Sequence, residues 1–252
     1  MFVLNRPLYL FITTFLLLWL AAWIGMRLRS GRHQFPESMR SDYGVVVGAT
    51  LTLLGLLIGF TFSMATTRYD NRKTLEEEEA NAIGTEYARL DFLPAEKLAG
   101  SQALLREYAG LRIQFYTTRD PAALQKITAA TTTIQNQLWA TVAGAAKLQP
   151  TPLSALAASG MNDVLNSQGY TQAAWWNRIP IAAWILMFLI AALSNLLLGY
   201  GMHGKATVLS VILPLAVSIS FFLIADIDSP RAGVIRIHPQ NQYAVTESLK
   251  GQ

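Results

Sequence analysis

The sequence predicts an all-α integral membrane protein, with four transmembrane helices and a helical water-facing domain inserted between the second and third of them. Charged residues make up only 14% of the 252 residues, against about 25% in ordinary soluble domains. The deficit is concentrated in four long uncharged runs. The segment between the second and third runs is rich in charge, and prolines mark the starts of its helices.

Each uncharged run has the length of a membrane span. A helix needs about 20 apolar residues to cross a hydrocarbon core of roughly 30 Å. The first run is longer than a signal-peptide core of about 7–15 residues, so we expect it to be retained as a span. The expected transmembrane helices cover about 8–28, 44–67, 179–202 and 206–225.

The distribution of cations favours a cytoplasmic middle domain. Four spans place both termini and the middle segment on one side, where seven Lys and Arg residues lie close to span ends. The other side has five. By the positive-inside rule, we expect a multi-pass protein of the cell (inner) membrane with both termini and the middle domain in the cytoplasm. The counted residues are Arg6, Arg68, Arg72, Lys73, Arg178, Arg231 and Arg236, against Arg27, Arg29, Arg32, Arg40 and Lys205.

The middle segment is predicted to be helical throughout. The first continues from the second span to Leu93, because proline disfavours the helical conformation of the residue before it, and a second covers about 95–118. Asp120-Pro121 and Thr151-Pro152 each supply an N-cap followed by a proline in the first turn. They start helices that run to about Leu148 and to near Gly169. The expected domains are 1–67 with the first two spans, 68–178, 179–226 with the last two spans, and a tail over 227–252.

The tail contains one alternating stretch, Val234-Ile235-Arg236-Ile237. It allows a short strand or an extended arm against a neighbour.

The sequence contains no pattern of residues typical of a catalytic or cofactor site. The chain has no cysteine, and its three histidines, His33, His203 and His238, have no partners at ligand spacing. There is no nucleophile elbow and no phosphate-binding loop. We therefore expect no enzyme activity, no cofactor and no metal centre. The net charge of +4 lies beside the spans and needs no nucleic acid as a partner.

The most charged feature is the run Glu76 to Glu79. Four consecutive residues of a helix point in four directions, so the carboxylates cannot converge as a ligand cage. One interpretation is a solvated stretch of helix paired with Arg72 and Lys73 at i+4 spacing. The other is a ring of negative charge, contributed by several subunits, that attracts cations.

The second span has a stripe of glycines that predicts close helix packing. At about 100° per residue the four glycines fall within one face, and two pairs have the G-x-x-x-G spacing that lets helices approach closely in lipid. The packing partner can belong to the same subunit or to another. The residues are Gly44, Gly48, Gly55 and Gly59.

Beside the glycines lies a second stripe with two possible roles. Thr52, Leu56 and Phe60 follow one another at four-residue spacing, and Ser63 and Thr67 continue on the same side. The stripe is either a second packing face or a pore wall. In a pore, Leu56 and Phe60 would form an apolar constriction that gates by dewetting.

Two stretches resemble bestrophin channels. The residues Gly59-Phe60, Thr67-Arg68-Tyr69 and Asn71-Arg72 are similar to the end of the second bestrophin helix, and Tyr69-Asp70 resembles a pair in bacterial members. Asp226-x-Asp228-Ser229-Pro230, followed by Gly233, resembles the acidic stretch after the last bestrophin helix. With Glu79-Ala80-Asn81-Ala82-Ile83-Gly84, nearly the whole chain is similar to the bacterial bestrophin-like domain family.

The resemblance implies a homopentameric ion channel whose second helices line the pore. It places the three-residue neck on Thr52, Leu56 and Phe60 and the inner pore mouth on Arg68, Tyr69, Asp70, Asn71 and Arg72. Thr52 departs from the family pattern, because a hydroxyl replaces an apolar side chain and makes one end of the neck wetter. The paired aromatic residues and the long acidic tail cluster of animal members are missing, which puts calcium control in doubt.

Three residues near the span ends have alternative roles. Arg68 either anchors the helix to lipid headgroups, forms a charged collar, or pairs with Asp70 of a neighbouring subunit. Asp226 and Asp228 either cap the tail through Asx-turns before Pro230 or form a weak cation site, since two carboxylates alone hold calcium poorly.

The sequence thus predicts a subunit of a homo-oligomeric, bestrophin-like channel whose partners are further copies of itself, membrane lipid and inorganic ions. The alternative is a non-conducting scaffold or sensor whose middle domain binds a cytoplasmic partner. Arg and acidic residues both lie near the inner end of the second span, so the sequence leaves the choice between anions and cations open.

Overall fold

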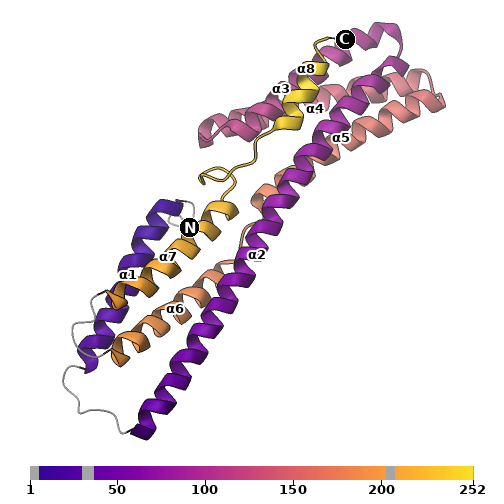
Figure 1. Cartoon of the computed structure of the whole chain (residues 1–252). Coiled ribbons are helices and arrows are strands. Elements are labelled where there is room, and N and C mark those ends of the chain that lie inside the picture. The colour runs from indigo at the N-terminus through magenta and orange to yellow at the C-terminus, as the bar shows by residue number, and fades with distance from the viewer. Residues whose placement is uncertain (1–5, 30–36, 203–207, 252) are drawn as a thin grey trace. The chain divides into compact units, whose positions relative to one another are not determined.

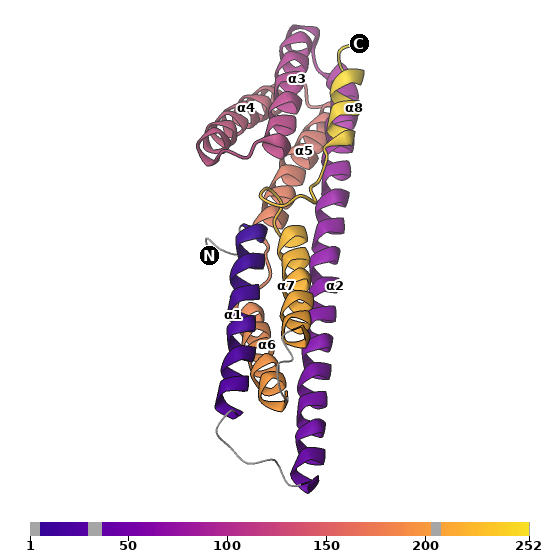
Figure 2. The same cartoon turned by 60° about the vertical axis from the view of Figure 1, so that its left-hand side comes forward.

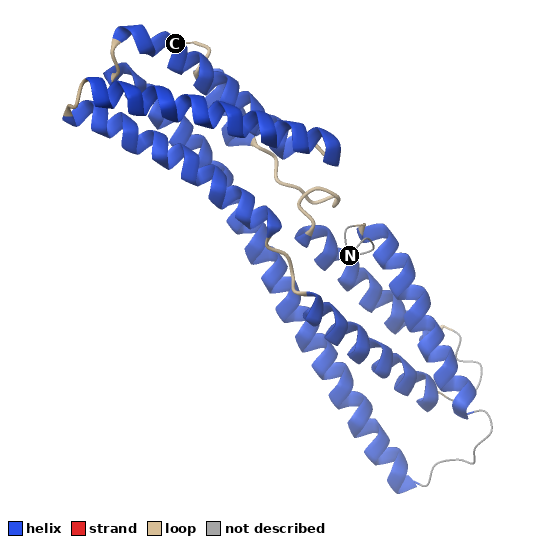
Figure 3. Ribbon diagram, turned by 180° about the vertical axis from the view of Figure 1, so that it is seen from behind, coloured by secondary structure: helices blue, strands red, loops and turns tan. Residues whose placement is uncertain are grey.

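The computed structural model describes residues 6–29, 37–202 and 208–251, and the described residues contain helices and loops but no strand (Figure 3). The predicted all-α fold is therefore confirmed for this part of the chain. In chain order the helices (Figure 1) are α1 (Pro7–Arg29), α2 (Glu37–Arg89), the 3-10 helix η2 (Leu90–Phe92), α3 (Ala95–Thr117), α4 (Pro121–Leu148), α5 (Pro152–Trp176), α6 (Ile181–Gly201), α7 (Leu209–Asp228) and α8 (Gln240–Ser248).

Four helical stretches are long and apolar enough to cross a membrane, in agreement with the sequence. They are Pro7–Arg29, Met39–Phe92, Pro152–Gly201 and Ser210–Asp228. Helix α2 has 53 residues and is about 80 Å long at 1.5 Å per residue, far more than the roughly 30 Å of a hydrocarbon core. Its second half therefore extends beyond the membrane without a break in the helix.

The chain divides into two compact units. The first comprises Met1–Arg68 and Arg178–Ile235, and the second comprises Tyr69–Asn177 and Arg236–Gln252. Helix α2 contributes its first half to one unit and its second half to the other.

In the first unit α1 packs against α6 and α7 (Figure 2). Gly25 of α1 lies against the backbone of α6, and Gly199 of α6 lies against the backbone at Ala22. A Cβ atom at either glycine would overlap backbone atoms of the facing helix. Small residues let helices approach closely in lipid, so this glycine pair brings α1 and α6 together.

The start of α2 is tied to the end of α6. The Tyr43 hydroxyl donates a hydrogen bond to the carbonyl of Leu197, and the Tyr43 ring lies against Gly201. At the end of α1, Arg29 donates to the carbonyl of Tyr200 over 3.1 Å. The Arg29 contact satisfies a carbonyl in the last turn of α6, where the final carbonyls have no partner within the helix.

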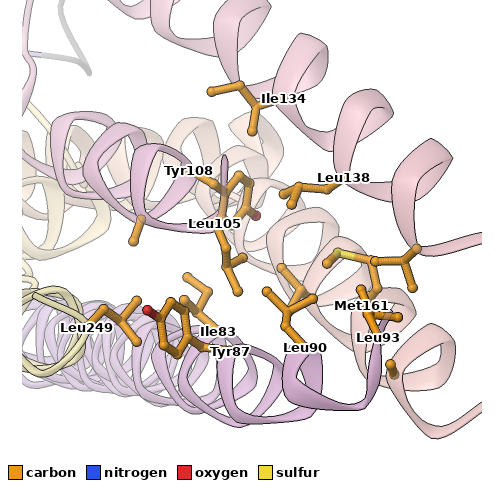
Figure 4. Close-up of a cluster of buried hydrophobic side chains, with 14 of the residues drawn as sticks. Ile83, Tyr87, Leu90, Leu93, Leu105, Tyr108, Ile134, Leu138, Met161 and Leu249 are labelled. Atoms are coloured by element: carbon orange, nitrogen blue, oxygen red, sulfur yellow. The ribbon is translucent and has the colours of Figure 1, made fainter. Parts of the chain in front are cut away.

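The second unit is built around a large apolar core. Side chains from α2, α3, α4, α5 and the C-terminal segment meet in it (Figure 4). Fully buried members include Ile83, Leu105, Leu138 and Met161. Burying such a side chain stabilises the fold by about 1.5–3 kcal/mol, so this unit has a sizeable hydrophobic core of its own.

The predicted helix starts in this unit are confirmed. The Asp120 carboxylate accepts hydrogen bonds from the backbone N–H groups of Ala122 and Ala123. The Thr151 side chain caps α5, and Ser154 completes a reciprocal capping box. Both caps satisfy N–H groups that the first helical turn leaves free.

One sequence prediction in this region is wrong, and of the two alternatives left open for the tail stretch the strand is not formed. Helix α5 does not end near Gly169 but continues to Trp176, where Arg72 binds its last carbonyls. The stretch 234–237 forms no strand. It leads instead into α8, which the sequence did not predict because its nine residues are largely polar and lack an apolar stripe.

Candidate ion pathway along helix α2

The five residues predicted to line a pore all lie on one exposed face of α2. Thr52, Leu56, Phe60, Ser63 and Thr67 are all exposed in the single chain. Leu56 is 52% exposed and Phe60 64% exposed. The hydroxyls of Thr52 and Thr67 donate to carbonyls one turn earlier, at Gly48 and Ser63. Their hydrogens therefore point back to the helix.

The buried face of α2 lies on the other side of the helix. Leu54, Thr61 and Ala65 are at most 6% exposed, and at about 100° per residue they fall roughly 140–180° from Leu56. The chain thus buries one face of this span and leaves the predicted pore face uncovered.

The glycines predicted to mediate packing are also uncovered within the chain. A Cβ atom at Gly44, Gly48, Gly55 or Gly59 would meet nothing within 4 Å. Their packing against other helices therefore stays a prediction, and it now concerns a partner outside this chain. Close approach of two span backbones at glycine is seen instead between α1 and α6.

Arg68 lies in an internal ion-pair cluster with Asp228, the last residue of α7. An Arg68 Nη1 atom lies 3.9 Å from Asp228 Oδ1, and the Arg68 side chain is 18% exposed. Arg178 Nε donates to the same carboxylate over 2.9 Å, and the backbone N–H of Ile179 also donates to it. The sequence predicted three other roles for Arg68, and Asp228 of the same chain was not among the predicted partners.

Arg72, predicted at the pore mouth, is turned inward instead. It is 1% exposed, and it donates to the carbonyls of Ala174 and Asn177 over 3.1 and 3.0 Å. It therefore caps the C-terminal end of α5, as cationic side chains commonly do. The Tyr69 hydroxyl donates to the carbonyl of Arg236 over 3.4 Å. Of the predicted mouth residues, only Asp70 and Asn71 are exposed.

Asp226 organises the chain after α7. Its two oxygens accept hydrogen bonds from the backbone N–H groups of Val234 and Ile235 over 2.8 and 2.7 Å. Gly233 lies so close to Asp226 that a Cβ atom there would overlap its carbonyl. The carboxylate thus binds the tail, but not through the predicted Asx-turn, because its donors lie eight and nine residues ahead.

The described residues contain no group of three His, Cys, Asp or Glu side chains that could hold a metal ion. The weak candidate ligands Asp226 and Asp228 are each bound by N–H donors of the chain. His33 and His203 lie outside the described residues.

The glutamate run divides between two faces of α2, and the prediction that it is wholly solvated is wrong. Glu76 is 1% and Glu79 0% exposed, whereas Glu77 and Glu78 are exposed. Glu76 accepts from the Asn241 side chain and from the backbone N–H of Gln242. It thereby caps the N-terminus of α8, where a carboxylate also meets the favourable end of the helix dipole.

Glu79 forms the centre of a buried network. Its carboxylate is paired with the Arg112 guanidinium and accepts hydrogen bonds from Tyr116 and Thr171 over 2.9 and 3.1 Å. Burial raises the pKa of Tyr116, and the Glu79 charge raises it further. The phenol therefore stays neutral and donates. All partners come from the same domain, so the network is structural.

The comparisons with known proteins agree with this architecture. A family model described as the Bestrophin-like domain matches residues 12–242. A structure of a bacterial bestrophin homologue from Klebsiella pneumoniae is similar with a TM-score of 0.64 and 16% identity, covering 96% of this chain and 99% of that one. A second structure of a homologue from that organism gives a TM-score of 0.62 and 17% identity, with 95% of each chain covered.

A structure described only as a membrane protein gives a TM-score of 0.65 and 16% identity, covering 95% of this chain and 97% of that one. No curated protein sequence matches the chain. At these identities the structural likeness shows the fold, whereas the family model spans nearly all of the sequence. The chain therefore belongs to the bestrophin-like family of membrane proteins.

Proposed function

We propose that this protein is the subunit of a homo-oligomeric, bestrophin-like ion channel in the cell (inner) membrane, with its middle domain and both termini in the cytoplasm. The first half of α2 lines the pore, and the resemblance to bestrophins implies five subunits. The observation that carries this proposal is the uncovered face of α2 with Leu56 and Phe60. It lies on the side of the helix away from the residues that α2 buries within the chain.

The stripe has the order of side chains that a gated pore needs. Leu56 and Phe60 from several copies would form a narrow apolar ring, which excludes water when it is tight and so blocks ions. Ser63 and Thr67 follow on the same face and offer hydroxyl oxygens beyond the ring. The open glycines supply a flat, side-chain-free surface next to the stripe, by which α2 can approach a neighbouring subunit closely.

The proposal is tested by reconstituting the full chain in planar bilayers and recording single channels. Replacing Phe60 by Ala removes the largest side chain of the ring, so unitary conductance or open probability should rise about twofold or more. Phe62→Ala is the matched control, because Phe62 is 42% exposed but lies about 120° from Leu56 around the helix. Absence of current from the unmodified protein, or equal effects of the two substitutions, would count against a pore at Phe60.

A non-conducting scaffold or sensor is the second candidate function. It is favoured by a groove of about 230 Å³ between α4 and α5, lined by Gln135, Asn136, Trp139, Asn162 and Leu165. Trp139 is 42% exposed there, beside amide groups that can bind a polypeptide backbone. Capture of one stoichiometric cytoplasmic protein that is lost in Trp139→Ala, together with absent conductance, would favour this function over a channel.

A further inference from the structure

The first unit contains an apolar cavity beside the start of α2, between this helix and the facing ends of α6 and α7. Its volume is about 490 Å³, within the range of about 300–1,000 Å³ that is typical of ligand pockets. Of its lining side chains, only that of Tyr43 carries a hydroxyl, amide or charged group. The lining residues are Tyr43, Gly44, Val47, Leu198, Gly201, Met202, Ile212 and Leu213.

The cavity arises from the way α2 is attached to its neighbours. Deeper in the span α2 is tightly packed, since Leu54 is 2% exposed. Near the start of the helix, the Tyr43 hydroxyl donates to the Leu197 carbonyl and the Tyr43 ring lies against Gly201. The ring therefore separates α2 from α6 like a spacer. Next to it, a Cβ atom at Gly44 would meet nothing within 4 Å.

The cavity lies on the side of α2 that faces away from the proposed pore. At about 100° per residue, Tyr43 and Val47 fall roughly 140–180° from Leu56 around the helix. The opposite wall consists of α6 and α7 of the same chain. The cavity is therefore internal to one subunit, and what fills it does not come from the pore.

The size and the apolar walls of the cavity suit a hydrocarbon chain. One turn of a helix with its side chains takes up roughly 400–600 Å³, so the cavity accommodates only about one turn of a neighbouring helix. Apolar cavities do not take up water, and a void forfeits dispersion contacts along its walls. A flexible acyl chain of the surrounding bilayer has neither disadvantage.

The rim of the cavity carries positive charge. Arg29 donates to the carbonyl of the lining residue Gly201 over 3.3 Å. Arg40 is exposed, precedes Gly44 by about one turn and lies within roughly 40° of it around α2. Asp42 lies about 160° from Arg40, so it faces away from the rim. Guanidinium groups bind phosphate well, and basic pockets between transmembrane helices bind anionic lipid headgroups.

We propose that the cavity is a binding site for an anionic phospholipid, with one acyl chain between α2, α6 and α7 and the phosphate beside Arg29 and Arg40. The bound lipid completes the packing at the start of α2, where the protein's own side chains leave space. The site goes beyond the proposed channel function, because lipid binding is measured on the protein itself and requires no current.

The first experiment is native mass spectrometry of the full chain, purified in detergent and supplied with equal amounts of phosphatidylglycerol and phosphatidylethanolamine. The unmodified protein should retain one phosphatidylglycerol per subunit. Gly44→Leu places a side chain in the cavity and should lower the lipid-bound fraction by about threefold or more. Gly55→Leu is the matched control, because it lies three turns along the same side of α2, in open space, and does not line the cavity.

A second pair of variants fills the cavity from its other wall. Leu213→Trp on α7 should lower the lipid-bound fraction as Gly44→Leu does. Leu215→Trp is its control, because Leu215 is 39% exposed and is not a lining residue. The result therefore does not depend on a single substitution in α2.

The same measurement tests the headgroup. Arg40→Gln should lower the preference for phosphatidylglycerol over phosphatidylethanolamine by about threefold or more, whereas Arg40→Lys should largely keep it. Arg27→Gln is the control, because Arg27 is also exposed but lies over the Trp23 ring at 4.9 Å. A preference that is the same in Arg40→Gln and in the unmodified protein overturns the anionic headgroup.

The masses also report the number of subunits, which distinguishes a lipid from a second copy of the chain. Loss of lipid in both cavity variants with an unchanged number of subunits supports the proposal. Equal lipid retention in the cavity variants and their controls overturns it. Dissociation of subunits in Gly44→Leu and Leu213→Trp, but not in the controls, also overturns it and assigns the cavity to an interface between copies.

Discussion

The carboxyl group of Glu86 should make the folded protein less stable as pH rises, and removing it should abolish that dependence. Glu86 lies on α2 well beyond the span, is 0% exposed, and neither of its oxygens has a hydrogen-bond partner among the described residues. It is pressed against Gly160 of α5, where a Cβ atom would overlap its carboxyl oxygen. Burial raises the pKa of Glu86 from 4.5 to about 8, although Arg89 opposes part of the increase.

The sign of the effect follows from proton linkage. The folded protein holds the Glu86 proton up to a pKa of about 8, whereas the unfolded chain releases it near the ordinary value for glutamate, about 4.3. Stability is therefore lost as pH rises between these two values and is constant above the upper one. Between about pH 6 and about pH 9 the loss amounts to roughly 2.7 kcal/mol, or about 5–11 °C in the midpoint of thermal unfolding.

The assay compares thermal unfolding of the detergent-solubilised protein and Glu86→Gln across this pH range. Gln keeps the shape and cannot ionise, so the two melting temperatures should differ more at high pH, with the variant the more stable. Glu77→Gln is the control on the same helix, because Glu77 is exposed and should follow the unmodified protein at every pH. Melting temperatures of the protein and Glu86→Gln that stay parallel from pH 6 to pH 9 would show that the carboxyl is already ionised in the folded state.

Three further predictions concern contacts that hold the fold. Gly199→Ala should destabilise the protein by about 1–3 kcal/mol in thermal unfolding, because the added methyl group overpacks against α1. The control is Gly169→Ala, where the methyl group enters open space, and it should stabilise α5 by up to about 1 kcal/mol. Glu79→Gln should cost about 3–5 kcal/mol because it leaves the Arg112 charge buried without a counter-charge, and a smaller loss in the same assay would indicate that water enters the network. Glu76→Gln should weaken the cap of α8 by about 1 kcal/mol and speed hydrogen exchange over residues 240–248, with no change at α4.

The sequence predicted the helices well because the signals that define them are local. Uncharged runs identified the spans, and Asp120-Pro121 and Thr151-Pro152 marked the starts of α4 and α5. Pro94 marked the end of α2 and η2. Each signal acts through a few neighbouring residues, so no knowledge of the tertiary structure was needed.

The predictions that failed depend on residues far apart in the sequence. Helix α8 begins where Glu76, 165 residues before Asn241, caps its first turn. Arg72 faces inward because the end of α5 presents carbonyls to it. The close glycine contact in the membrane belongs to Gly25 and Gly199, neither of which is part of a G-x-x-x-G pair. No local pattern reports such partners, and nothing in the sequence around Glu86 indicates that Gly160 lies beside it.

The buried residues of α2 nevertheless share one face of the helix. Taking Leu56 as zero, the buried residues Leu54, Thr61, Arg72, Glu79 and Glu86 all fall at about 120–160° around the wheel. Charged and apolar side chains thus share the same buried face, and hydropathy alone cannot recognise it. The opposite face is exposed along the whole described helix and becomes more polar towards its end.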